Sequence, residues 1–302
     1  MTNILITGGT GQVGTYLQQF AWPASVNIVA PTRDELDLAN TNSIEAIMYA
    51  RPWAAVINCG AYTAVDRCET EIVAAWQTNA LAPAALAQAT ARAKIPLIHV
   101  STDYVFGGDK AGAYLETDQL APLGVYGASK QGGEQAVCTA NPRHVIVRTA
   151  WVVSPFCNNF IKTMLRVGAE RPLLRVVDDQ HGCPTHAGDL AAVLAQITLR
   201  HLSDANAPAG TYHFSNAGRT TWFGLAREIF RITAALGLKV PQLEAITTEQ
   251  YPLPAKRPAN SLLNTDKLTH DFGITPRPWQ DAVHEIVSIL TNQDFTASGA
   301  AP

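Results

Sequence analysis

Tyr126 and Lys130 lie four residues apart at the start of a segment rich in alanine and glutamine, which is expected to be a helix. Residues at this spacing share one face of a helix, so the lysine ammonium would lie beside the phenol. A neighbouring cation favours the phenolate and lowers the pKa of a tyrosine from about 10 toward neutral pH. Such a phenol can protonate a carbonyl oxygen while hydride adds to the carbon. The spacing alone is common by chance, usually in an exposed amphipathic pair.

Thr102 stands at the end of an apolar strand that precedes this pair, and Asp103 follows it directly. A threonine hydroxyl in this place can donate a hydrogen bond to the carbonyl oxygen that Tyr126 protonates. A strand end with threonine, followed by tyrosine and lysine on the next helix, is more specific than any of the three residues alone. Thr102, Tyr126 and Lys130 are therefore the predicted catalytic residues.

A short apolar strand at residues 4–7 leads into a loop with Gly8, Gly11 and Gly14, and then into a helix-compatible segment. Glycines at these positions allow a tight turn, a close approach of the backbone to a pyrophosphate, and close packing of helix on strand. The start of the helix then presents free N–H groups to the phosphates. We expect this loop to bind a dinucleotide; a glycine-rich turn without a ligand is the alternative.

The tip of the second predicted strand carries no carboxylate that would bind the 2′-hydroxyl of an NAD ribose. Arg33 follows that strand and can meet the 2′-phosphate of NADPH, although a solvated surface charge is the other interpretation. Asp37 and Leu38 lie where a turn could contact the adenine. NADPH is therefore the expected cofactor, with NADH as the alternative.

The pattern of apolar segments predicts an α/β fold with a Rossmann-type doubly wound parallel sheet. Short β-branched runs alternate with longer stretches of helical periodicity, such as residues 71–93. The predicted strands are residues 4–7, 27–30, 55–58, 97–101 and 145–148. Residues 1–152 are expected to form the dinucleotide-binding Rossmann domain.

In the second half of the chain, proline and glycine clusters interrupt this alternation of strand and helix patterns. Residues 153–302 are expected to form a smaller, mixed, mostly helical substrate domain, with some segments returning to the Rossmann sheet. Helical periodicity is clearest near residues 222–237 and 279–290.

The composition is that of a globular protein without a polyanion-binding surface. Of the 302 residues, 47% are hydrophobic and 16% charged, which is enough apolar material for a large core. The formal net charge of −3 speaks against nucleic acid as a partner. No signal sequence precedes the first strand, and no apolar run approaches the ~20 residues that span a bilayer. Five cysteines without a Cys-x-x-Cys pair indicate reduced thiols, so we expect a cytoplasmic protein away from membranes.

His181, Cys183 and His186 crowd into six residues, and such a cluster invites a zinc interpretation. The surrounding residues Asp179, Gln180, Gly182, Pro184 and Thr185 match the framework of a known family, in which this segment is a loop near the substrate. We therefore expect no metal at this place.

The chain resembles the extended short-chain dehydrogenase/reductases and, within them, the dTDP-4-dehydrorhamnose reductase family. The similar segments cover nearly the whole sequence: residues 8–14, 58–66, 101–107, 125–130, 148–151, 158–160, 179–185 and 257–265. The resemblance implies NADPH-dependent reduction of the C4 keto group of a nucleotide-linked sugar, dTDP-4-dehydro-L-rhamnose, to dTDP-L-rhamnose.

The resemblance also implies roles for individual residues. Gly11, Gln12 and Val13 would contact the cofactor phosphates, while Tyr126 and Lys130 would also meet the nicotinamide ribose. The residues implied along the adenosine half are Asp37, Leu38, Ala61, Tyr62 and Thr63.

On the substrate side, the resemblance implies that Thr102, Asp103 and Trp151 hold the sugar, with the indole of Trp151 as a flat apolar wall. Arg257 is the implied partner of the nucleotide diphosphate, and an ordinary loop charge is its other interpretation.

This sequence departs from its relatives at the start of the first helix. Relatives with a metal-bridged dimer carry glutamate there, where this chain has Thr15 and Tyr16. A homodimer is compatible with the resemblance, but Mg²⁺ at such an interface is doubtful.

Two other functions fit the same fold. A sugar-nucleotide dehydratase or epimerase is the first, but dehydratases of this kind place glutamate after the aspartate, and Tyr104 follows Asp103 here. The second is a non-catalytic regulatory subunit of the methionine adenosyltransferase type, against which the intact Thr102, Tyr126 and Lys130 argue.

Overall fold

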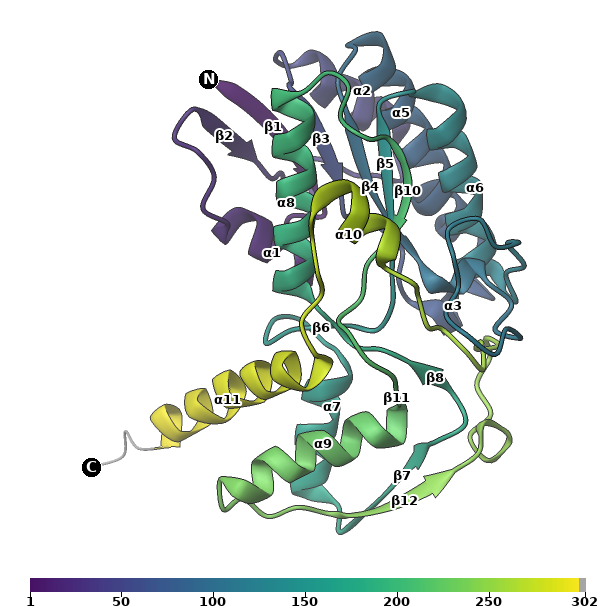
Figure 1. Cartoon of the computed structure of the whole chain (residues 1–302), viewed down its shortest axis with the longest axis vertical. Coiled ribbons are helices and arrows are strands. Elements are labelled where there is room, and N and C mark those ends of the chain that lie inside the picture. Colours follow the sequence, from purple (N-terminus) through teal and green to yellow (C-terminus); the bar gives the residue numbers. More distant parts are fainter. Residues whose placement is uncertain (299–302) are drawn as a thin grey trace.

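The computed structural model describes residues 1–298, in which a parallel sheet lies between helices and a second lobe of helices and strand pairs lies below it in the view of Figure 1. The six strands of the sheet lie in the order β10-β5-β4-β3-β1-β2, and neighbouring strands are parallel. Their bounds are β1 Thr2–Thr7, β2 Val26–Val29, β3 Ala55–Asn58, β4 Leu97–Thr102, β5 His144–Thr149 and β10 Gly210–His213. The five strands predicted from the sequence are confirmed to within two residues at each end.

Helices cover both faces of the sheet, which explains why its strands are continuous apolar runs. Along β1, Ile4 and Ile6 belong to the core on one face and Leu5 to the core on the other. The first face is covered by α1 Gln12–Gln19 and α8 Ala187–Ser203, and the second by α2 Thr41–Tyr49, α5 Ala82–Arg92 and α6 Val125–Ala140. Both α8 and β10 come late in the chain, so the backbone returns from the second lobe to this sheet.

The helical stretch predicted at residues 71–93 is present but not uniform. It consists of α4 Ile72–Trp76, a π-helical segment Gln77–Leu81, and α5. Single π-helical turns inside helices are often found at functional sites. The short helix α3 Val65–Cys68 precedes this stretch, and a 3-10 turn Asp103–Val105 follows β4.

The second lobe contains three strand pairs and three longer helices around its own apolar core. The pairs are β7 Leu173–Val177 with β12 Gln242–Ile246, β8 His181–Gly182 with β11 Thr220–Thr221, and β6 Val152–Val153 with β9 Thr185–His186. The helices are α7 Phe160–Glu170, α9 Trp222–Ala235 and α11 Trp279–Ser298, which confirms the helices expected near 222–237 and 279–290. A 3-10 turn Thr248–Gln250 and α10 Asp266–Phe272 complete the elements. Within residues 1–298, no helix has the length and apolarity needed to cross a bilayer.

A buried ion pair ties α6 to the sheet. The guanidinium of Arg148 on β5 donates to both carboxylate oxygens of Glu134 at 2.9 and 2.7 Å, and each side chain is 5% exposed. The same guanidinium lies over the ring of Phe106, 5.1 Å from its centroid. Because the pair is bidentate and shielded from water, removing one partner leaves an uncompensated buried charge.

Glu134→Gln is therefore expected to lower the free energy of unfolding by about 3 kcal/mol in urea titrations. The matched control is Glu244→Gln, whose ion pair with Arg175 is half-exposed and should be worth less than about 1 kcal/mol. An equal, small loss in both variants would show that water reaches the Arg148 pair.

Candidate active site

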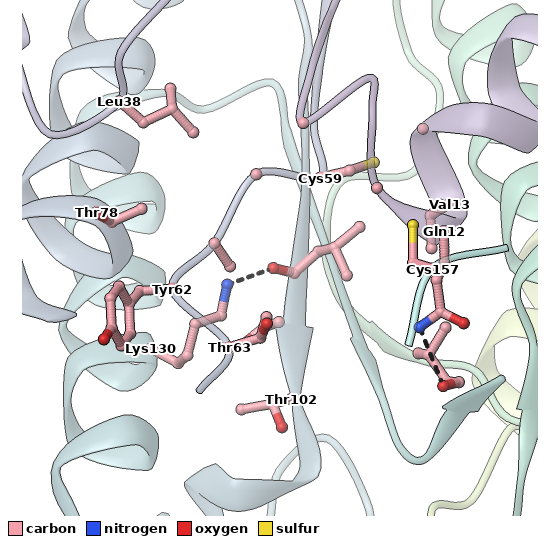
Figure 2. Close-up of a pocket in the computed structure, with 18 of the residues that line it drawn as sticks. Gln12, Val13, Leu38, Cys59, Tyr62, Thr63, Thr78, Thr102, Lys130 and Cys157 are labelled. Carbon is pink, nitrogen blue, oxygen red and sulfur yellow. Dashed lines mark hydrogen bonds between the residues drawn. The ribbon is translucent and has the colours of Figure 1, made fainter. Parts of the chain in front are cut away.

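A cavity of about 580 Å³ opens where the parallel strands end. The segments that follow β1, β2, β3, β4 and β5 all contribute to its walls, as expected for the ligand crevice of an open α/β sheet. Every residue predicted for cofactor, catalysis or sugar lines this cavity except Arg257. In Figure 2, Gln12, Val13 and Cys157 lie on one side of it and Leu38, Thr78 and Tyr62 on the other.

The glycine loop has the geometry of a phosphate cradle. Gly8 has φ +69°, and a Cβ on it would lie 2.6 Å from the backbone nitrogen of Gly60. A Cβ on Gly14 would overlap the carbonyl oxygen of Gly8, which is the close packing of helix on strand expected from the sequence. A Cβ on Gly11 would meet only that same oxygen, at 3.3 Å. Gly11 also lines the cavity, so the lack of a side chain here leaves room for a ligand. Because no side chain caps the first turn of α1, its N–H groups fit a bound pyrophosphate.

Gln12 ties this loop to the chain that enters the second lobe. Its amide donates to the carbonyl of Val152 at 3.3 Å, and its Oε1 accepts from Ser154 at 2.7 Å and from Asn159 at 3.1 Å. The sequence predicts a phosphate contact for Gln12, but no local pattern indicates that it also connects the loop to the second lobe. The partners are more than 100 residues away, so only the tertiary structure reveals them.

The predicted adenosine wall is held by a buried asparagine in the π-helical segment. Asn79 accepts a hydrogen bond from the backbone N–H of Tyr62 at 2.8 Å and donates to the carbonyl of Tyr62 and to the hydroxyl of Ser129 at 3.1 Å each. It therefore links the loop beside the cavity to the helix that carries Tyr126. Asn79 belongs to no motif in this sequence, so its role at the cavity is not predicted by any local pattern.

Further residues line the cavity for which the sequence predicts no role in the site. They are neighbours of predicted ones along the chain or come from helix and loop segments without a signature: Thr10, Pro31, Leu36, Ala39, Cys59, Gly60, Val65, Thr78, Val100, Ser101, Tyr104, Thr149, Val152, Cys157 and Asn158. Proximity to a predicted residue was the only signal available for most of them.

Lys130 is buried, and its ammonium donates to the backbone carbonyl of Val100 at 2.6 Å (Figure 2). Burial lowers the pKa of Lys130 to about 8, an effect that the nearby carboxylate of Glu134 opposes. The lysine thus reaches across from α6 to β4, at the floor of the cavity.

The pKa of Tyr126 is raised above its usual range, chiefly because its phenol is desolvated. The hydroxyl of Thr102 partly offsets this, and the negative charge of Asp103 adds to it. The prediction that Lys130 lowers this pKa is wrong here, because desolvation of the phenol dominates. Tyr126 is consequently protonated at neutral pH, which is the state that a proton donor requires.

Asp103 lies beside this phenol and is 2% exposed. Its Oδ1 accepts a hydrogen bond from the hydroxyl of Thr102 at 2.8 Å. Burial raises the pKa of Asp103 to about 6, although the hydroxyls of Ser261 and Thr102 oppose the rise. The Thr102 proton is therefore directed to Asp103, and the predicted donation to a substrate carbonyl requires this hydroxyl to turn.

Arg257 faces a second cavity of about 530 Å³. Its guanidinium donates to both carboxylate oxygens of Asp66 at 3.0 and 2.9 Å, which holds the pKa of that carboxyl below its usual value. Tyr104 contacts Arg257 and packs its ring against Tyr126, edge to face, with centroids 5.4 Å apart. The two cavities thus adjoin at Tyr104 and Arg257.

In the segment with His181, Cys183 and His186, the cysteine and the second histidine form hydrogen bonds with the backbone. The thiol of Cys183 donates to the carbonyl of Asn216 at 2.8 Å, and Nδ1 of His186 accepts from the first N–H groups of α8. In the part of the chain that the structure describes, no three His, Cys, Asp or Glu side chains are grouped to hold a metal ion.

Comparison with known sequences matches almost the whole chain to one family model. The model is described as RmlD substrate binding domain and covers residues 1–292. The chain belongs to this family. The dTDP-4-dehydrorhamnose reductase of Aggregatibacter actinomycetemcomitans is 41% identical, over 95% of this chain and 98% of the relative.

Solved structures of RmlD relatives superimpose along the same length. A dTDP-4-dehydrorhamnose reductase from Clostridium acetobutylicum has a TM-score of 0.89 at 35% identity and covers 96% of this chain and 100% of its own. The enzyme of that name from Bacillus anthracis, solved in complex with NADP, has a TM-score of 0.87 at 34% identity and the same coverage.

The raised pKa of Asp103 predicts how the stability of this RmlD-family protein depends on pH. The folded state holds the Asp103 proton up to about pH 6, whereas the unfolded chain releases it near pH 3.8. Stability from this group is thus complete below about pH 4 and is lost as the pH rises through about 6. Relative to Asp103→Asn, which does not titrate, the wild type should lose about 2–3 kcal/mol between pH 4 and 7.

Urea titrations of both proteins across this pH range check the prediction. Ser261→Ala removes a hydrogen bond that favours the charged carboxylate, so it should shift the transition to higher pH. Parallel pH profiles of the wild type and Asp103→Asn would mean that Asp103 is solvated in solution.

Proposed function

We propose that this protein reduces the C4 keto group of dTDP-4-dehydro-L-rhamnose with NADPH, which yields dTDP-L-rhamnose in the last step of dTDP-rhamnose biosynthesis. The observation that carries the proposal is the buried phenol of Tyr126 beside Thr102, in a cavity that also contains the glycine loop at the start of α1. The names of relatives that match the chain over its full length, and the NADP bound to one of them, support the same reaction.

The cavity offers a place for each part of the cofactor. Gly8, Gly11, Gln12, Val13 and Gly14 would hold the pyrophosphate on the start of α1. Lys130 would meet the nicotinamide ribose, and Arg33 the 2′-phosphate. The residues for the adenosine half are Asp37, Leu38, Ala61, Tyr62 and Thr63.

When bound, the nicotinamide supplies the hydride that reduces C4. Tyr126 gives its phenolic proton to the carbonyl oxygen, and a hydroxyl replaces the keto group. Burial keeps that phenol protonated beforehand, and the negative charge of Asp103 adds to this because it opposes formation of the phenolate. Thr102 orients the carbonyl once its hydroxyl turns from Asp103 to the substrate.

The second cavity fits the nucleotide end of the substrate. Arg175, Lys256 and Arg257 supply positive charge for a diphosphate, and Phe160 supplies aromatic surface for a base. The division into residues 1–152 for the cofactor and 153–302 for the substrate belongs to this proposal. It is supported by the second lobe's contribution to this cavity.

Reduction fits the site better than elimination does. A dehydratase needs a carboxylate base after Asp103, and the phenol of Tyr104 has a pKa raised far above neutral by burial. The five cysteines are free thiols, which supports a cytoplasmic location, where thiols stay reduced.

Tyr126→Phe is expected to lower kcat by about 10²–10⁴-fold, because it removes the proton donor without removing the ring. The measurement is NADPH oxidation with dTDP-4-dehydro-L-rhamnose, alongside the Kd for NADPH, which should stay within about twofold. Tyr49→Phe, at an exposed position, is the control. Turnover at the wild-type rate in Tyr126→Phe would remove the tyrosine from the mechanism. A wild type that never oxidises NADPH would favour the non-catalytic regulatory subunit instead.

Arg33→Ala is expected to raise the KM for NADPH about tenfold and to leave the KM for NADH unchanged, because only NADPH carries the 2′-phosphate. Steady-state rates with each cofactor give both values. Arg51→Ala is the control, since that guanidinium lies over Trp53, away from the cavity. Equal effects on both cofactors would show that Arg33 does not read the 2′ position.

A further inference from the structure

Two tryptophans stack where the two cavities adjoin. Trp151 lines the first cavity and Trp222 the second, and their rings are nearly parallel at 14° with centroids 3.7 Å apart. The wall between the cavities is therefore two rings thick at this point. Trp151 cannot withdraw from the first cavity unless Trp222 gives way behind it.

The backbone and one glycine fix Trp151. Its φ of +47° is in the left-handed region, which non-glycine residues seldom occupy without support from their surroundings. Its carbonyl accepts a hydrogen bond from the N–H of Thr185 at 3.1 Å. A Cβ on Gly182 would lie 2.6 Å from two ring carbons of the indole, so only glycine leaves space for the ring here.

Trp222 is held from its other edge. Its indole N–H donates to Oε1 of Gln180 at 3.2 Å, and the amide of Gln180 donates to the hydroxyl of Thr248 at 3.0 Å. Trp222 is also the first residue of α9, whose preceding Thr221 accepts a hydrogen bond from the N–H of Gly224 at 3.0 Å. The ring is thus locked by contacts on the same segment, residues 180–185, that supports Trp151.

We propose that Trp222 is a positioning residue, which holds the indole of Trp151 as a rigid wall against the sugar. This inference rests on the proposed function. Hydride transfer depends steeply on distance, and displacement of about 1 Å by a remote mutation can cost 10²-fold in rate. Residues 180–185 then support both tryptophans. Gln180 accepts a hydrogen bond from the indole of Trp222, and Gly182 leaves space for the indole of Trp151.

Trp222→Ala is expected to lower kcat at saturating substrate by about ten- to a hundredfold with the Kd for NADPH unchanged. Trp222→Phe keeps a ring behind Trp151 and should restore kcat to within about threefold of the wild type. Gly182→Ala would place a Cβ 2.6 Å from two ring carbons of the same indole, so it should displace the ring and lower kcat as Trp222→Ala does. Wild-type kcat in Trp222→Ala would overturn the proposal.

A double-mutant cycle separates positioning from a mere loss of packing. If Trp222 acts through Trp151, the variant with both tryptophans changed to alanine should have the kcat of Trp151→Ala to within about twofold. Leu253→Ala, which also removes apolar surface from the second cavity, is the control and should combine additively with Trp151→Ala. Additive effects of Trp222→Ala and Trp151→Ala would overturn the proposal.

Circular dichroism tests the stack without turnover. Two indoles at this separation couple their electronic transitions and, where the transition dipoles are rotated relative to one another within the stack, give a paired positive and negative band in the far ultraviolet. Trp151→Phe and Trp222→Phe should each abolish the same pair of bands, and Trp22→Phe should leave it unchanged. Bands that survive both substitutions would show that the rings do not stack in solution. A wild type with these bands but no NADPH oxidation would instead contradict the proposed function, and with it the role of Trp222 in holding Trp151 against the sugar.

Discussion

The hydrogen bond from the Lys130 ammonium to the carbonyl of Val100 fastens helix α6 to strand β4, and the site on both elements depends on it. The same helix carries Tyr126, and the same strand ends at Thr102. A buried ammonium needs a counter-charge nearby, which Glu134 supplies one turn further along α6. Glu134 is in turn held by Arg148 on β5. One chain of buried charge therefore sets the position of the proton donor relative to the sheet.

Desolvation around this chain decides which groups carry protons. Asp103 and Tyr126 lie side by side at the end of β4, and burial raises the pKa of both. At neutral pH the carboxyl of Asp103 is largely ionised while the phenol of Tyr126 keeps its proton. Two neighbouring groups thus differ in protonation state, and only Tyr126 has a proton to donate.

The second lobe contributes Arg257 and Trp222 to the edge of this site. Arg257 reaches Asp66 in the first lobe, and Tyr104 lies between that ion pair and Tyr126. A tyrosine in this place fills the position where an eliminating enzyme needs a base. The Trp151–Trp222 stack closes the wall between the cavities in the same way, with one ring from each side.

The sequence by itself determined the parts that depend on neighbours along the chain. The five strands, the glycine triplet and the spacing of Tyr126 and Lys130 are local patterns, and the structure places them as expected. Only the tertiary structure decided that the pKa of Tyr126 is raised, because desolvation comes from packing that no local pattern encodes. The same holds for the partners of Arg257, Gln12 and Trp151, which come from distant segments and meet only in the folded chain.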